Sequence, residues 1–447
     1  MDAVACSMYF FILYLLHLRL IAGADNASYV PSENIVLNCG SNTSEFVEYD
    51  GRNWSGDADS PYVPANADTN SLIARAPDTL DSIPEVPYMT ARIFMSQFTY
   101  TFNVTPGPNF IRLHFYPASY FHFNVSNAFL SVSAANFTLL HNFSVSLYAD
   151  YLNLAYFMKE FVVHVSGSVL ELTFAPSYNA SDAYAFVNGI EIVSMPLDLY
   201  IRSDDAPLPL VGHDTKLVYI YNDSAMEMLY RLNVGGEQIP PKYDTGMFRS
   251  WDTDEVYILG ANIGIQPSNM SMPVLYTDDA PPYSAPADVY RTSRSMAPFE
   301  NGLVNLNFNM TWYFPVDSAD EEFDPIAWSG EPGVAAHRDY VVKVPQANEG
   351  KQDLWLDLHP NKDDKPMYYN AFLNGVEIFK LSNFDKNLAG LNPSRRFDSG
   401  SDYSDAKAPY VAHFNRSSKK LKYILIGCGL GAVVLPILLC LVLYRLK

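Results

Sequence analysis

The stretch AYAFVNGIEIVSMP, Ala183 to Pro196, occurs a second time as YYNAFLNGVEIFKLS, Tyr368 to Ser382. Each copy is preceded by three further segments in the same order. VLNCG from Val36 matches RLNVGG from Arg231. YDGRNWSGDAD from Tyr49 matches YDTGMFRSWDTDE from Tyr243, and FVVHV from Phe161 matches YVVKV from Tyr340. Four matches in one order predict a duplicated domain.

Within the copies, apolar residues recur mainly with a period of two. The runs are rich in aromatic and β-branched residues, as in FTYTFNV from Phe98, NFIRLHFYP from Asn109, VLELTFAP from Val169 and KLVYIYN from Lys216. This pattern is typical of strands with one buried face. We therefore predict an all-β fold with two tandem β-sandwich modules, residues 25–195 and 217–381, joined by a proline-containing connector at 196–216.

The second module is shorter than the first. Val104 aligns with Val316 at an offset of 212, whereas Phe161 aligns with Tyr340 at an offset of 179, so 33 residues of module one have no counterpart in module two. In module one this interval contains NFIRLHFYP and the strands that follow. We expect the loss of two or three strands to expose the core of module two, or to force a rearrangement.

Apolar segments flank the modules. Residues 1–24 have the length and the small-residue cleavage pattern of a signal peptide. Residues 423–444 form an uncharged run of 22 residues, which as a helix would span roughly 33 Å and cross a bilayer. We expect a polar stalk at 382–422 and a short cytosolic tail at 445–447. The predicted protein is a single-pass type I protein of the plasma membrane with extracellular modules.

Glycosylation motifs support this orientation. Asn-x-Ser/Thr sequons lie between the two apolar segments at Asn26, Asn42, Asn53, Asn103, Asn124, Asn136, Asn142, Asn179, Asn222, Asn269, Asn309 and Asn415. A series along the whole middle of the chain indicates that it faces the secretory lumen. Cys39 is the only cysteine between the apolar segments, so we expect the modules to be held by their cores rather than by an internal disulfide.

The formal charge of −20 argues against nucleic acid as a partner and favours a cationic one. No cofactor is expected.

The markers of the second module carry a family resemblance. These are YRLNVGG from Tyr230, DTGMFRSW from Asp244, APADVYRTSRSM from Ala285, DLWLDLHPN from Asp353, NAFLNGVEIFKL from Asn370 and NLAGLNP from Asn387. With them, residues 35–393 resemble the ectodomain of the plant malectin-like receptor kinases of the FERONIA type. The resemblance implies tandem malectin-like β-sandwiches that recognise cell-wall polysaccharide, including pectin, or secreted rapid alkalinization factor peptides, the latter with small glycolipid-anchored co-receptors.

The family continues into a serine/threonine kinase, and this sequence contains no Gly-rich phosphate loop with a strand lysine, no HRD and no DFG. Two interpretations follow. Either the chain is a kinase-less receptor or co-receptor, or it is the truncated record of a receptor kinase. In the first case we expect lateral pairing with receptor kinases of the family. Gly427 and Gly431, at GxxxG spacing, would let two membrane helices approach closely, although small residues there can also be merely tolerated.

Binding is more plausible than catalysis. The run FYPASYFHF places Tyr116, Tyr120, Phe121 and Phe123 close together, and aromatic faces stack on sugar rings or anchor a peptide. The alternative is that these residues pack in the core.

An anchored wall-modifying glycosidase is the competing enzymatic hypothesis. Paired acids such as Glu321 and Glu322, or the set Asp252, Asp254 and Glu255, could supply an acid and a base. Solvated acidic loops are the simpler interpretation, and neither the acids nor the histidines follow a known metal-site or triad spacing.

Overall fold

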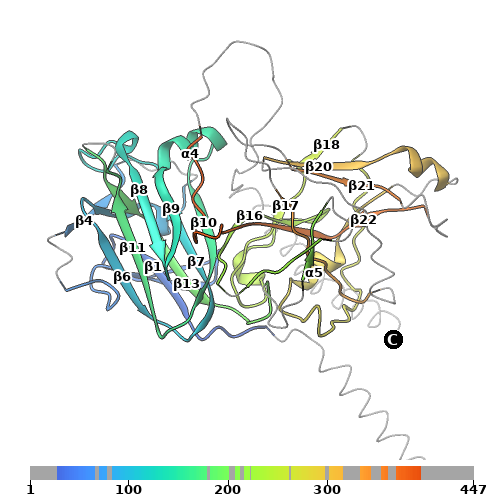
Figure 1. The fold of residues 1–447 in the computed structure, drawn as a ribbon, viewed down its shortest axis with the longest axis horizontal. Helices are drawn as coiled ribbons and strands as arrows, with labels where there is room; N and C mark the ends of the chain where they lie inside the picture. The colour runs from blue at the N-terminus through green and yellow to red at the C-terminus, as the bar shows by residue number, and fades with distance from the viewer. Residues whose placement is uncertain are drawn as a thin grey trace, which may run out of the picture.

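The computed structural model describes residues 28–393, apart from 66–69, 78–82, 179–181, 201–206, 212–215, 222, 261–262, 297–301, 316–332, 344–353 and 361–368. Two β modules lie side by side along the longest axis of the molecule (Figure 1). The predicted signal peptide, most of the stalk, the apolar segment 423–444 and the tail fall outside the described residues. Within the described part, no helix is both long and apolar enough to cross a membrane.

One large sheet runs through both modules. Its order is β2 (Glu45–Val47), β3 (Arg52–Gly56), β1 (Asn34–Asn38), β13 (Gly189–Ser194), β7 (Gly107–Phe115), β10 (Phe157–Val165), β16 (Met226–Asn233) and β17 (Asp252–Thr253), and β23 (Gly375–Leu381) pairs with β16. The last three strands belong to module two. A continuous backbone ladder therefore crosses the boundary that the sequence places at the connector.

Module one is a complete sandwich. A second sheet, β6 (Phe98–Asn103), β11 (Val169–Pro176), β8 (Phe129–Ala134) and β9 (Phe137–Ser144), faces the large sheet. Alternating residues of both sheets, such as Ile111, Leu113, Tyr100 and Leu172, are fully buried in one core. A smaller sheet, β12 (Ala185–Val187), β5 (Thr90–Phe94) and β4 (Ser71–Arg75), closes one side, with helices α3 (Glu85–Tyr88), η1 (Val125–Asn127) and α4 (Val145–Leu152) in the connections.

Module two has fewer strands in its described part. Opposite β16 and β23 lies a sheet of β18 (Ile258–Leu259), β20 (Met310–Phe314) and β21 (Leu354–Leu358), and a core around Trp312 and Phe314 fills the space between. Two short pairs are β14 (Leu208–Pro209) with β15 (Leu217–Val218), and β19 (Arg294–Ser295) with β22 (Phe372–Leu373). The helices are η2 (Pro241–Tyr243), α5 (Ala287–Arg291) and η3 (Gly302–Asn307).

The strand predictions are largely confirmed, with two corrections. FTYTFNV, NFIRLHF and VLELTFAP form β6, β7 and β11, but KLVYIYN contributes only the two-residue β15. FVVHV lies in β10, which pairs with β7 and β16, whereas among the described residues of its counterpart only Val341 forms a bridge, to Leu210. No described strand of module two corresponds to β7.

The duplication extends to individual hydrogen bonds. Asn188 donates to the carbonyls of Tyr88 and Thr90, at 2.9 and 2.7 Å. Its counterpart Asn374 donates to those of Tyr290 and Thr292, at 3.1 and 2.6 Å. Each NG asparagine thus satisfies two backbone carbonyls at or just beyond the end of a short helix, α3 or α5, with its side-chain amide, which explains why both copies retain asparagine.

Each module contains a buried aspartate that forms an ion pair with an arginine. Asp57 accepts from Arg92 Nε at 2.7 Å, and Asp254 accepts from Arg294 Nε at 2.7 Å. The glycine after each LNC or LNV tripeptide donates its amide to this aspartate, Gly40 at 2.7 Å and Gly235 at 2.9 Å. Both glycines have positive φ, and a Cβ on either would lie 2.1–2.2 Å from a backbone oxygen, so only glycine fits.

Within the described residues, module two is open on one side. All six residues of β13 are buried, whereas every residue of its counterpart β23 is half-exposed. The inward residues of β11, Leu170 and Leu172, are fully buried, whereas Leu354 and Leu356 of β21 are only partly buried. The strands that would flank β21 and β23, equivalent to β8 and β7, fall in the interval that module two lacks.

We expect this opening to weaken module two. Amide hydrogens of β20 and β21 should exchange about tenfold faster, or more, than those of β6 and β11, because a side-open sandwich buries less apolar surface and opens at lower cost. Hydrogen exchange read by mass spectrometry on the intact chain measures this directly. Equal protection of the two strand pairs would show that module two closes its core by other means.

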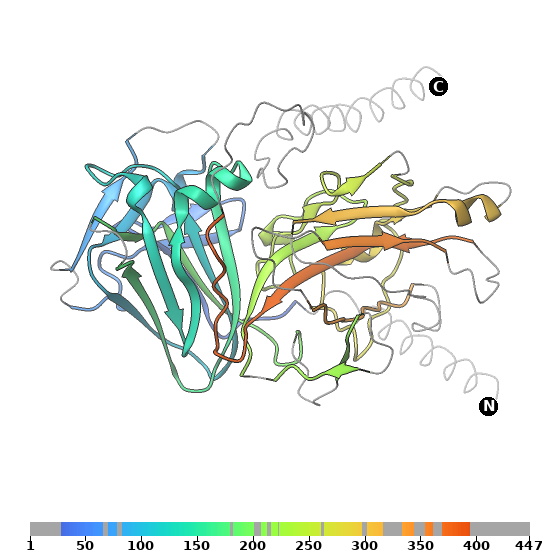
Figure 2. The ribbon, with the colours of Figure 1, turned by 45° about the horizontal axis from the view of Figure 1, so that its top comes forward.

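The segment after β23 corrects the predicted stalk. Residues 383–393 run back along module one (Figure 2), where the Thr138 amide donates to Lys386 O at 3.0 Å and the Leu388 amide to Thr138 O at 2.9 Å. The Leu388 side chain is fully buried in the core of module one. The stalk, predicted to begin at 382, therefore begins no earlier than residue 394, because the preceding residues are held by packing and hydrogen bonds.

Candidate functional site: the aromatic loop and the module junction

The aromatic loop that follows β7 splits into buried and exposed parts. Tyr120 is fully buried, and its hydroxyl accepts from Asn188 Nδ2 at 2.7 Å. Tyr116 and Phe123 pack partly against the core, and Phe123 lies 5.0 Å, centroid to centroid, from Tyr184. Phe121, with a φ of 51°, is 73% exposed. Only Phe121 of the four presents most of its ring to a ligand, so the loop carries no broad aromatic platform.

The acidic candidates that the structure describes do not form an open catalytic pair. Asp254 is fully buried and bound to Arg294 and Trp312, while the neighbouring Glu255 is exposed. Glu321 and Glu322 lie outside the described residues. Among the residues that are described, no group of three or more histidine, cysteine, aspartate or glutamate side chains could hold a metal ion.

The most highly organised polar region lies between the modules. Strands β10 and β16 pair antiparallel, with Glu160 opposite Met228 and Val162 opposite Met226. Beside them, the buried Lys159 and Glu227 form an ion pair across the boundary. Backbone and side chains together therefore lock the second module onto an edge of the first.

Glu160 is the centre of the junction. Arg112 Nε of module one donates to Oε2 at 2.6 Å, and Arg231 Nη2 of module two donates to Oε1 at 2.8 Å. All three side chains are buried. Burial alone would raise the pKa of Glu160, but the two guanidinium groups outweigh burial and lower it.

The charges alternate outward from Glu160. Arg112 also binds Glu191 at 3.0 Å, and Glu191 binds Arg52 at 2.8 Å. On the other side Arg231 binds Glu377 at 2.5 Å. Glu191 and Glu377 are the repeated glutamates of the two NG motifs, so the duplication places matched acids on both sides of the junction.

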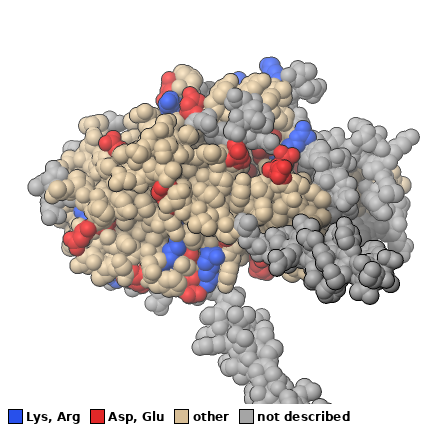
Figure 3. Space-filling model, turned by 90° about the horizontal axis from the view of Figure 1, so that it is seen from below, with Lys and Arg blue, Asp and Glu red and all other residues tan. Residues whose placement is uncertain are grey.

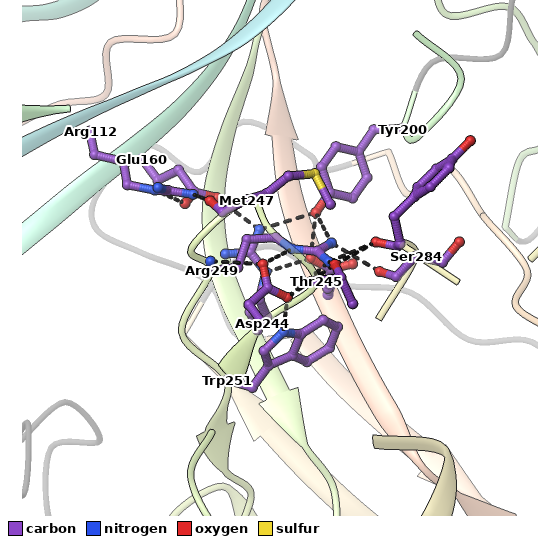
Figure 4. Close-up of polar contacts among 12 residues, drawn as sticks. Arg112, Glu160, Tyr200, Asp244, Thr245, Met247, Arg249, Trp251 and Ser284 are labelled. Atoms are coloured by element: carbon purple, nitrogen blue, oxygen red, sulfur yellow. Dashed lines mark hydrogen bonds and ion pairs between the residues drawn. The ribbon is translucent and has the colours of Figure 1, made fainter. Parts of the chain in front are cut away.

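The loop DTGMFRSW is organised by one arginine (Figure 4). Arg249 binds the Asp244 carboxylate through Nε at 3.0 Å, and its Nη1 donates to the Tyr200 hydroxyl at 3.1 Å and to the Ser284 carbonyl at 2.9 Å. The loop is also held to module one, because Arg112 Nη2 donates to the Met247 carbonyl at 2.9 Å. These hydrogen bonds hold the loop in one conformation, and the side chains that make them are not available as catalytic groups.

Sequence reasoning did not identify this junction. A signal was present, because Arg112, Glu160 and Arg231 interrupt otherwise apolar strand runs. Charged residues are almost never fully buried unless they are paired. A charge inside a strand pattern therefore indicates a buried partner, although it does not say which one.

A search of protein families matches residues 37–325 to the malectin-like domain. This chain belongs to the malectin-like family. It is 44% identical over 465 aligned positions to the receptor-like protein kinase FERONIA of Arabidopsis thaliana, with 95% of this chain and 50% of FERONIA covered. It is 34% identical to the receptor-like protein kinase ANXUR1 of the same plant, with 81% and 45% covered. The chain thus spans about half the length of these curated relatives.

Solved structures agree with this assignment. The crystal structure of the plant receptor-like kinase FER matches at a TM-score of 0.72 and 44% identity, with 81% of this chain and 99% of that chain covered. FER in complex with the peptide RALF23 and with LLG2 gives the same TM-score and identity, covering 82% and 99%. The extracellular domain of ANXUR1 from Arabidopsis thaliana matches at 0.73 and 32% identity, covering 81% and 100%.

Basic and acidic side chains are interspersed on the surface of the chain. On the face in Figure 3, isolated basic and acidic side chains lie in a largely uncharged surface, so this face holds no continuous acidic patch. Of the predicted glycosylation sites, Asn42, Asn53, Asn103, Asn124, Asn136, Asn269 and Asn309 are exposed and Asn142 is half-buried. Asn26, Asn179, Asn222 and Asn415, together with Gly427 and Gly431, lie outside the described residues.

A small cavity of about 10 Å³ lies at the malectin-like junction, lined among others by Met158, Tyr230 and Asp252. It has room for about one water molecule. Burial raises the pKa of Asp252 to about 6, although a hydrogen bond from Gln238 and the charge of Arg231 favour the ionised form. The folded chain therefore holds the Asp252 proton more tightly than the unfolded chain does.

The raised pKa of Asp252 predicts a pH dependence of stability. The contribution of the neutral carboxyl is complete below the ordinary pKa of 3.8, falls as pH rises to about 6, and is constant above that. We expect Asp252→Asn to stabilise the chain relative to wild type by an amount that grows by about 2 kcal/mol between pH 4 and pH 7. Urea unfolding at several pH values measures the difference, and Glu255→Gln is the exposed control. A difference that does not change with pH would contradict the prediction.

Proposed function

We propose that this chain is the extracellular, ligand-binding part of a plant cell-surface receptor that binds a secreted peptide together with a small partner protein. The observation that carries the proposal is the match, at 44% identity and 99% coverage, to FER in its complex with RALF23 and LLG2. The buried junction adds a physical reason. Two modules locked by a continuous sheet and paired charges present a preorganised surface, which lowers the entropy lost on binding.

Direct binding tests the proposal. The full chain, expressed in plant cells and reconstituted in nanodiscs, should bind RALF23 more tightly when LLG2 is present than when it is not, as measured by biolayer interferometry. A scrambled RALF23 peptide is the control. No difference between RALF23 and its scrambled form, with and without LLG2, would overturn the proposal.

Wall polysaccharide is the second candidate ligand, supported by the exposed ring of Phe121. Pectin or glucan binding that Phe121→Ala reduces would favour it. The competing glycosidase hypothesis finds no support in the described residues, because the buried Asp254 is engaged with Arg294. Release of reducing ends from pectin by the purified chain would reverse this preference.

We also propose that the chain sits in the plasma membrane and pairs laterally with receptor kinases of its family. Co-immunoprecipitation from plant membranes tests the pairing. Gly427→Leu and Gly431→Leu should weaken it, because larger side chains keep two helices apart. Pairing that is unchanged in both variants would remove these glycines from the proposal.

A further inference from the structure

The edge of β23 is the feature of module two that its counterpart in module one does not share. In module one, β13 lies between β1 and β7 and pairs with both. In module two, β23 pairs with β16 along one edge, and no other strand among the described residues pairs with its second edge. A free edge of this kind is a template for an added strand.

Module one shows which charged residues pair at the equivalent edge. Glu191 of β13 lies directly opposite Arg112 of β7 and binds it at 3.0 Å. Glu377, its counterpart, lies opposite Arg231 of β16 and receives Arg231 Nε and the Tyr200 hydroxyl on Oε1 alone. Oε2 of Glu377 has no partner among the described residues, and the side chain is 20% exposed. No described strand of module two therefore supplies the position that Arg112 fills in module one, beside a carboxylate that can accept a cation.

Apolar side chains line both faces of the same strand. Val376 and Ile378 pack partly on the core around Trp312, and Phe379 and Leu381 pack partly on the junction cluster around Met226. An added strand with alternating apolar residues would complete both layers. Strand β7 does this in module one, where all residues from Asn109 to Phe115 are buried.

We infer that the free edge of β23 binds an extended cationic segment, which adds as an antiparallel strand with a basic side chain opposite Glu377 and apolar side chains on either side of it. This inference rests on the proposed function, because it assigns part of the peptide ligand to this edge. Backbone hydrogen bonds supply the affinity, and the carboxylate of Glu377 fixes the register.

A second copy of the chain fits the edge less well. Two β23 strands related by a two-fold axis place residues of the same face opposite one another. Glu377 shares its face with Phe379 and Leu381, whereas the only cation of the strand, Lys380, lies on the opposite face. Self-pairing would therefore give Glu377 no cation beyond Arg231, whereas a cationic partner would supply a second one.

A synthetic strand tests the edge independently of the natural ligand. The probe is the peptide NFIRLHF, the sequence of Asn109 to Phe115, attached to a polyethylene glycol handle and added to the full chain in nanodiscs. We expect micromolar binding, at least tenfold weaker binding of the probe with Arg112→Glu, and slower hydrogen exchange of residues 375–381 on binding. Residues 189–194 of β13 should show no change. Equal binding of both probes, or no added protection of β23, would overturn the inference.

Competition separates this inference from the proposed function. If RALF23 binds with LLG2 but neither displaces the probe nor protects β23, the edge is not the ligand site and the proposed function stands. If the probe protects β23 but RALF23 does not bind, the proposed function fails while the strand site stands. Protection of β23 that rises with protein concentration, without any peptide, would identify a second copy as the occupant and overturn the inference.

Discussion

Replacing Glu160 by glutamine should lower the free energy of unfolding by about 3–5 kcal/mol, the usual cost of removing one partner from a buried ion pair. Glu160 lies between Arg112 and Arg231, and both guanidinium groups are buried. A glutamine amide turns an N–H group toward one of them and removes the negative charge that the two guanidinium groups share, which leaves them only Glu191 and Glu377 as counter-charges. Thermal and urea unfolding of the intact chain measure the loss.

The matched control is Glu171→Gln, which makes the same chemical change at an exposed position of β11 in the same module. It should change stability by less than about 0.5 kcal/mol. A double-mutant cycle with Arg231→Met should show strong coupling, because both residues belong to one contact. If Glu160→Gln behaves like Glu171→Gln, the junction is not held by buried charge and the modules are joined mainly by the β10–β16 ladder.

Replacing Asp57 or Asp254, the buried aspartates bound by arginine, should lower the free energy of unfolding by a similar amount. The carboxylate of Asp57 accepts from Arg92, Tyr100 and the Gly40 amide, and that of Asp254 accepts from Arg294, Trp312 and the Gly235 amide. Asparagine keeps the shape but offers an N–H group where only donors approach. We expect Asp57→Asn and Asp254→Asn each to cost about 3–5 kcal/mol.

The exposed neighbours Asp59→Asn and Glu255→Gln are the matched controls, since each lies one or two residues away. Hydrogen exchange should also show which strands are destabilised in each variant. Asp254→Asn should speed exchange mainly in β20 and β21, because module two is already open on one side. Asp57→Asn should act on β5 and β6. Uniform acceleration across the whole chain in both variants would show that the two modules unfold as one unit.

Local patterns predicted much of the architecture. The paired NG motifs indicated the duplication, and the structure places Asn188 and Asn374 in equivalent hydrogen bonds. The offset between the copies predicts a shortened second module, in which β23 is half-exposed. Both inferences rest on residue order, which the sequence records directly.

Contacts between distant segments could not be predicted in this way. The aromatic run after β7 has one composition, yet Tyr120 is buried, whereas Phe121, which has a positive φ, is exposed. Residues 383–393 are polar and aperiodic like a stalk, but a single apolar side chain, Leu388, is buried in module one. Periodicity cannot detect a segment that is held by one anchor.

The sequence by itself determined the strand period and the order of the repeated segments, which are local properties, and these predict a duplicated β-sandwich chain with one module shortened. Only the tertiary structure decided that the modules share one sheet through β10 and β16, that Glu160 lies between Arg112 and Arg231, and that one edge of β23 pairs with no described strand. The physical reason is that a buried charge requires a partner, but its own strand does not specify which distant residue provides one.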